Sequence, residues 1–141
     1  MDYAALIDHT ILAPQATKEQ VKQLCGEAME YGFHSVCVNS SFVYYCAQLL
    51  KDSHIKVCTV IGFPLGAMST AGKVAEAEQA MADGASELDM VIHVGMIKSG
   101  DWEYVKQDIS SVVEAARGKA AVKVILETCL LTEQEKTQAC R

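Results

Sequence analysis

The chain has few basic residues, few prolines and no long apolar run. Its 12 Lys and Arg stand against 18 Asp and Glu, which gives a net charge of −6 and argues against nucleic acid or an anionic membrane as a partner. No apolar run approaches the roughly 20 residues of a transmembrane helix. Asp2 also stands where a signal peptide would carry positive charge. We therefore expect a cytoplasmic protein.

Metal and disulfide signatures are also missing. The four histidines lack ligand spacing such as H-x-x-x-H, so we expect no metal site and no cofactor. No two of the cysteines have C-x-x-C spacing, and in a reducing compartment they are small buried hydrophobes or single functional thiols. The six are Cys25, Cys37, Cys46, Cys58, Cys129 and Cys140.

What the chain does contain is an alternation of short apolar segments with amphipathic ones. With 141 residues, half of them apolar and 21% charged, it is long enough for one folded domain over residues 1–141. The patterns predict strands at 6–12, 34–39, 56–61, 87–94 and 122–127. They predict helices at 17–32, 40–50, 69–84 and 102–117 and one beginning at 132, several with capping residues at their starts.

Five strand-then-helix units predict an α/β fold with a parallel sheet and right-handed crossovers. A doubly wound sheet of the dinucleotide-binding type would have G-x-G-x-x-G after its first strand, which residues 13–17 lack, but a flavodoxin-like sheet fits the strand count. The strand faces favour a partial TIM (β/α)8 barrel instead, because polar groups share one face on four strands. These groups are Asp8, Thr10, Cys37, Asn39, Asp89, His93, Lys123 and Glu127. A whole barrel needs eight units and about 250 residues, so we expect a barrel truncated before strand six.

Two buried-strand residues are the candidates for catalysis. Lys123 lies between two valines, where desolvation can lower its pKa and make the amine a nucleophile for Schiff-base formation. Alternatively it is a structural lysine paired with Glu127 or Asp89. Asp89 stands in an apolar strand, where burial raises a carboxyl pKa toward the range useful for proton transfer. Alternatively, Asp89 forms an ion pair that compensates the charge of a buried amine.

Three further residues are candidates for substrate binding. Asp8 and Thr10 either bind polar substrate atoms or cap the following loop. Cys37 either contacts substrate or is an inert core thiol.

Five segments together resemble one family. They are IDHTILAP at 7–14, VCVN at 36–39, TVIGFPLG at 59–66, ELDMVI at 87–92 and VKVILET at 122–128. In this order and spacing they look like deoxyribose-phosphate aldolase across essentially the whole chain.

The resemblance implies a metal-free class I aldolase with a β/α barrel. The family cleaves 2-deoxy-D-ribose 5-phosphate reversibly to D-glyceraldehyde 3-phosphate and acetaldehyde through a lysine Schiff base. Asp89 matches the family's proton donor/acceptor, and Lys123 matches a lysine beside the reacting centre. Asp8 and Cys37 match residues that line the substrate pocket, and His93 replaces a common asparagine.

The resemblance places the Schiff-base lysine on a sixth strand, a second catalytic lysine on a seventh, and the phosphate site after the seventh and eighth. These segments are not among the 141 residues. The first hypothesis is an aldolase in which Lys123 substitutes as nucleophile or another chain supplies these segments. The second is an inactive, self-associating barrel fragment, and the third is a flavodoxin-like binding module. Unpaired edges at strands one and five predict a homo-oligomer.

Overall fold

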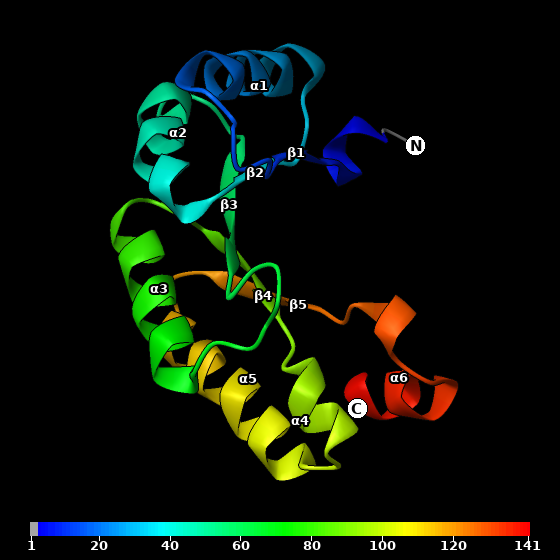
Figure 1. Cartoon of the computed structure of the whole chain (residues 1–141). Helices are drawn as coiled ribbons and strands as arrows, with labels where there is room; N and C mark the ends of the chain where they lie inside the picture. Colours follow the sequence, from blue (N-terminus) through cyan, green and yellow to red (C-terminus); the bar gives the residue numbers. More distant parts are fainter. Residues whose placement is uncertain (1–2) are drawn as a thin grey trace.

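Five parallel strands form one sheet in the order β1-β2-β3-β4-β5 (Figure 1). The computed structural model describes residues 3–141. The strands are β1 (Asp8–Ile11), β2 (Ser35–Val38), β3 (Lys56–Ile61), β4 (Glu87–Val91) and β5 (Ala121–Ile125). All four neighbouring pairs are parallel, which confirms the predicted α/β class.

Helices follow the strands, and several start where their capping residues predict. Thr17 and Thr132 each form a capping box with the residue three positions on, and Gly32 ends the first long helix with a left-handed φ of 68°. None of the helices within residues 3–141 is long and apolar enough to cross a membrane. The helices are α1 (Lys18–Tyr31), α2 (Val43–Leu50), α3 (Thr70–Ala82), α4 (Val94–Lys98), α5 (Trp102–Ala116) and α6 (Glu133–Ala139).

Four predicted strands are too long. The predicted strand 34–39 exceeds β2 at both ends, so Asn39 lies after the strand. The segment Ala4–Leu6 is a 3-10 helix before β1. β4 ends at Val91, because His93 caps a short helix, α4, by accepting a hydrogen bond from the Met96 backbone N–H at 3.3 Å. β5 ends at Ile125, and Glu127 has a left-handed φ of 54° beyond it. His93 and Glu127 therefore lie beyond the ends of β4 and β5, and the prediction that they extend the polar strand face is wrong.

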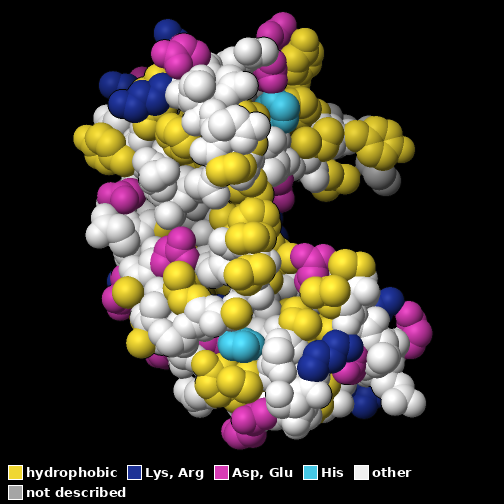
Figure 2. Space-filling model, viewed as in Figure 1, with side chains coloured by type: hydrophobic (Ala, Val, Ile, Leu, Met, Phe, Trp, Pro, Cys, Tyr) yellow, Lys and Arg dark blue, Asp and Glu magenta, His cyan; other side chains and the backbone are white. Residues whose placement is uncertain are grey.

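The curvature of the sheet decides between an open sheet and a barrel. Neighbouring strands lie about 4.8 Å apart, so β1 and β5 would be about 19 Å apart in a flat sheet. Yet Asp8 Oδ2 of β1 lies 2.7 Å from Lys123 Nζ of β5. The sheet is therefore strongly curled, and Figure 2 shows the resulting hollow on one side of the molecule. This confirms the predicted partial barrel of five β/α units.

The two faces of the sheet differ in chemistry. The long helices lie along the outer, convex side (Figure 1), and an apolar core fills the space between them and the strands. Helices cover both faces of an open parallel sheet, whereas the inner face of a barrel holds its own side chains. Here the inner face holds a small cluster of Cys37, Cys58 and Val60 beside charged residues.

A buried ion pair connects two helices of the outer layer. Lys73 of α3 and Asp108 of α5 are 0% and 1% exposed, and their Nζ and Oδ2 atoms lie 2.5 Å apart. Lys73 also donates to the backbone carbonyl of Val91 at 2.9 Å, and Thr70 donates to Asp108 at 2.8 Å. The pair thus joins α3, α5 and the end of β4, and sequence reasoning had not identified it.

Breaking this pair should strongly destabilise the fold. Asp108→Asn should lower the free energy of unfolding by about 3–5 kcal/mol, because it leaves the Lys73 charge buried without its counter-ion. Urea unfolding at pH 7 measures the change. The double variant K73M/D108L should recover much of the loss, since it removes both charges. Glu114→Gln, which breaks an exposed pair with Arg117, is the control and should leave the midpoint nearly unchanged.

Candidate active site

Alternate residues of the strands point to the inner face and meet there because of the strand register. Asp89 is the register partner of Lys123 in β5 and of Val60 in β3. Cys37 is the partner of Cys58. The predicted placement of Asp89, Lys123 and Cys37 on one face is confirmed.

Lys123 forms ion pairs with three carboxylates of the site. Its Nζ lies 2.7 Å from Asp8 Oδ2, 3.3 Å from Asp89 Oδ1 and 3.5 Å from Glu87 Oε2. The predicted pairing with Asp89 is confirmed. The alternative pairing with Glu127 is wrong, because that side chain lies beyond the end of β5 and accepts a hydrogen bond from the Cys129 thiol at 3.2 Å.

Sequence reasoning missed Glu87, which is only 4% exposed. It accepts hydrogen bonds from Lys56 and from His34, both at 2.8 Å. Burial acts to raise its pKa, but these two partners outweigh burial and hold the pKa below its usual value. Its place two residues before Asp89 was the available signal, since residues i and i+2 of a strand share a face.

Asp8 is held in its ionised form by the same network. Burial acts to raise the pKa of Asp8, but hydrogen bonds from Lys123 and from Ser35 at 2.6 Å outweigh it and lower the pKa. Because the folded pKa is the lower one, Asp8 stabilises the fold above its ordinary pKa of 3.8. That contribution is lost as the pH falls through the folded value.

The pKa of Lys123 is raised, contrary to the expectation that desolvation lowers it. Burial does act to lower it, but the hydrogen bond to Asp8 and the neighbouring negative charges outweigh burial. The stabilisation by this ammonium is therefore complete below pH 10.5 and is lost only as the pH rises through the folded pKa. Lys123 is a cation at neutral pH and not a free amine.

The other two predicted substrate-binding residues, Cys37 and Thr10, lie outside the ion pairs of Lys123. Cys37 is buried in contact with Cys58, whose pKa is raised by the hydrogen bond between the two thiols and by burial. The Thr10 hydroxyl is exposed and donates to the backbone carbonyl of Asp8 at 2.8 Å. Cys58 of β3 also lies on the inner face, in the cluster with Cys37 and Val60.

Comparison with known proteins decides the family. The model of the DeoC/LacD family aldolases matches residues 3–140. The chain belongs to the DeoC/LacD family of aldolases. The deoxyribose-phosphate aldolase of Thermoanaerobacter pseudethanolicus is 55% identical over 143 residues, which cover all of this chain and 64% of that protein.

Solved structures of this aldolase family have the same fold. A crystal structure from Coccidioides immitis, provisionally named a deoxyribose-phosphate aldolase, matches 99% of this chain and 55% of its own with a TM-score of 0.96 and 45% identity. The deoxyribose phosphate aldolase from Aeropyrum pernix, described as tetrameric, matches 96% of this chain and 57% of its own with a TM-score of 0.88 and 36% identity. The chain thus spans less than two thirds of the length of these relatives.

Removing the ammonium should raise the pKa of its partner in this aldolase-family site. In Lys123→Met, Asp8 loses its strongest stabilising hydrogen bond, while burial continues to disfavour the carboxylate. A ¹³C NMR titration of the Asp8 carboxyl measures the shift. Lys136→Met, which removes an exposed partner of Glu133, should leave the Asp8 titration unchanged. An unaltered Asp8 pKa in Lys123→Met would show that the bridge across the sheet does not form.

Proposed function

We propose that the inner face supplies the proton-transfer and substrate-positioning part of a class I aldolase for 2-deoxy-D-ribose 5-phosphate. The contact of Asp89 Oδ1 with Lys123 Nζ, 3.3 Å long, carries this proposal. It joins a carboxylate and an ammonium side by side on the concave face. Membership of the aldolase family and the resemblance of residues 87–92 and 122–128 support it.

The chemistry needs a group that can both take and return a proton. Before cleavage, a lysine amine forms a Schiff base with the C1 aldehyde and water is lost. Cleavage breaks the C2–C3 bond of the open-chain sugar while the C3 hydroxyl loses its proton and becomes the aldehyde of D-glyceraldehyde 3-phosphate. The electron pair stays on C2, which is reprotonated, and water then hydrolyses the Schiff base to release acetaldehyde. We assign the proton transfers to Asp89, because a positioned carboxyl group does this work as general acid and base.

Lys123 has an electrostatic role in this proposal. Its raised pKa keeps it protonated, and an ammonium cannot attack a carbonyl. Its charge instead stabilises the negative charge that develops on the substrate oxygen and on Asp89. The Schiff base then requires a different lysine, for which the resemblance points to a sixth strand.

The other inner-face residues form the wall of the substrate site. Thr10 and Cys37 are the proposed contacts to a small phosphorylated sugar or aldehyde, and Asp8 positions Lys123. No cofactor is needed for this reaction. A cytoplasmic site of action suits the four buried free thiols, because thiols stay reduced in that compartment.

A chimera tests the proposed role of Asp89. Residues 1–141 would be joined to the part of the Thermoanaerobacter pseudethanolicus protein that the alignment does not cover. We expect this chimera to cleave 2-deoxy-D-ribose 5-phosphate, and Asp89→Asn to lower its kcat about 10²–10⁴-fold, as expected for loss of general acid–base catalysis. Asp52→Asn, in an exposed turn after α2, is the matched control and should retain full activity.

Trapping with borohydride and acetaldehyde completes this test. The adduct should form on a lysine outside residues 1–141, and the 141-residue chain alone should give none on Lys123. Equal kcat in Asp89→Asn and the parent chimera would overturn the proton-transfer role. An adduct on Lys123 would instead establish it as the nucleophile.

A second candidate function is self-association of an inactive barrel fragment. Within residues 3–141, β1 and β5 each have one paired neighbour, so each leaves an open edge. Apolar side chains in the segments that flank these two strands are exposed, including Leu6 before β1 at 72% and Leu130 after β5 at 53%. Open strand edges and exposed apolar surface favour association. We propose a homo-oligomer that covers these edges; the Aeropyrum pernix relative is itself described as tetrameric.

Charges beside the edges should weaken this association. The variant L6K/L130K should shift the molar mass from light scattering toward that of a 15.3 kDa monomer, because like charges oppose edge pairing. Tyr44→Lys, on the exposed face of α2, adds a charge away from the edges and is the control. A parent chain that stays monomeric at high concentration would contradict the proposal.

A further inference from the structure

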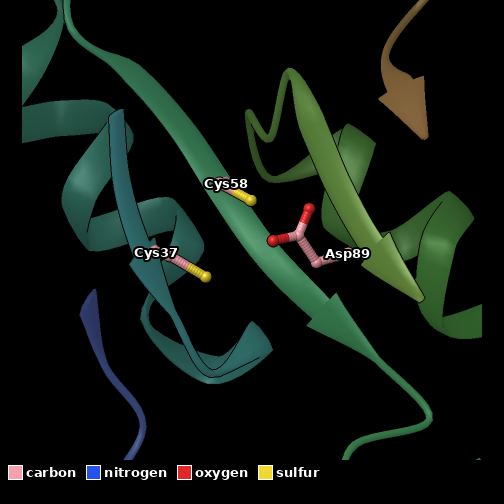
Figure 3. Close-up of side chains that lie close together, drawn as sticks. All are labelled: Cys37, Cys58 and Asp89. Atoms are coloured by element: carbon pink, nitrogen blue, oxygen red, sulfur yellow. The ribbon is translucent and has the colours of Figure 1, made fainter. Parts of the chain in front are cut away.

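Two thiols and one carboxylate converge on the inner face. Cys37 of β2, Cys58 of β3 and Asp89 of β4 point toward one another from three adjacent strands (Figure 3). One Sγ or carboxylate oxygen from each residue lies within 4.8 Å of the others. Both cysteines are free and buried. Three possible ligand atoms thus surround one point inside the concave face.

The hydrogen bonding of Asp89 is a second observation about this residue. Among the described residues, Asp89 Oδ1 is the one buried side-chain nitrogen or oxygen without a hydrogen-bond partner. Its ion pair with Lys123 at 3.3 Å does not have hydrogen-bond geometry. A buried carboxylate oxygen is expensive to leave without a partner. The atom is therefore available to a ligand.

We propose that Cys37, Cys58 and Asp89 form a binding site for a soft divalent cation, with Zn²⁺ or Cd²⁺ as the occupant. Thiolate sulfur selects such ions, and two thiolates with a carboxylate leave a fourth tetrahedral position for water. With Zn–S bonds of about 2.3 Å, tetrahedral coordination needs the two sulfurs roughly 3.8 Å apart. Side-chain movements of about 1 Å or less would achieve this.

The charges balance when the ion binds. Each thiol loses its proton to solvent as its metal–sulfur bond forms, so one M²⁺ replaces two protons. The two thiolates and the Asp89 carboxylate then carry −3, and the bound site carries −1. The adjacent Lys123 ammonium offsets that remaining charge. A near-neutral cluster lowers the cost of burying an ion on the inner face.

A second cluster also offers three possible metal ligands, but its carboxylates already have other partners. Asp8, His34 and Glu87 also bring one ligand atom each within 4.8 Å of the others. There, however, Lys56 and Lys123 already donate to the two carboxylates at 2.8 and 2.7 Å. A divalent cation would have to displace these ammonium groups. This cluster is therefore an internal charge network.

Occupation of the thiolate site would also remove Asp89 from proton transfer. This consequence rests on the proposed function, since it assumes that Asp89 is the proton-transfer group. Zn²⁺ at the site would inhibit aldol cleavage reversibly, and a chelator would restore it. Binding itself is measured without turnover, so failure of one proposal can be distinguished from failure of the other.

Cobalt titration of the reduced 141-residue protein tests the site. The background is C129S/C140S, which removes the two exposed thiols. We expect one Co²⁺ per chain, with thiolate-to-cobalt charge transfer in the near ultraviolet and the intense visible bands of tetrahedral Co²⁺, both displaced by stoichiometric Zn²⁺. Cys58→Ala should abolish the charge-transfer signature of a two-thiolate site. Asp89→Asn should weaken binding at least 10–100-fold, as loss of even an outer-shell partner does.

The control uses the other thiol pair of the chain. Cys25 and Cys46 share a hydrogen bond between α1 and α2 and are not part of either cluster described here. Cys46→Ala should leave the cobalt affinity unchanged. The proposal is overturned if the C129S/C140S protein gives no thiolate band, or if Asp89→Asn and Cys58→Ala bind as tightly as the background. Circular dichroism confirms that each variant is folded.

Discussion

The contact between Asp8 and Lys123 depends on the curl of the whole sheet. The two side chains come from the outermost strands, 115 residues apart in the chain, and meet at 2.7 Å. No flat sheet of five strands brings its edges so close. The contact gives Lys123 a counter-ion that offsets the cost of desolvating its charge, and it places the ammonium beside Asp89. The curvature of the sheet and the charge pairing in the site therefore depend on each other.

The inner face balances its charges within a small space. Glu87 has Lys56 and His34 as partners, and Asp8 has Lys123 and Ser35. These groups are saturated by short hydrogen bonds, and their pKa values move toward the ionised forms. Asp89 differs, because one of its oxygens is buried and accepts no hydrogen bond. Within the described part of the chain, this network leaves acceptor capacity at the carboxylate to which we assign proton transfer.

Strand alternation predicted much of this site, but not its long-range pairs. It placed Asp8, Cys37, Asp89 and Lys123 on one face, since period two follows directly from strand geometry. Strand ends could not be read from the apolar pattern: residues 92–94 continue it, while His93 already caps α4. Lys73 and Asp108 are 35 residues apart and join two helices, and no local sequence pattern in either helix indicates that they pair. Such pairings depend on packing, which sequence periodicity does not describe.

The four buried cysteines show how the sheet divides one residue type into two chemical settings. Cys25 and Cys46 belong to the apolar core of the outer layer, where a thiol behaves as a small hydrophobic group. Cys37 and Cys58 are equally buried, but their register places them beside Asp89. Composition and spacing treat the two pairs alike. The difference arises because the inner face of a curled sheet must hold side chains from several strands at one centre, and there a packing residue also becomes a potential ligand.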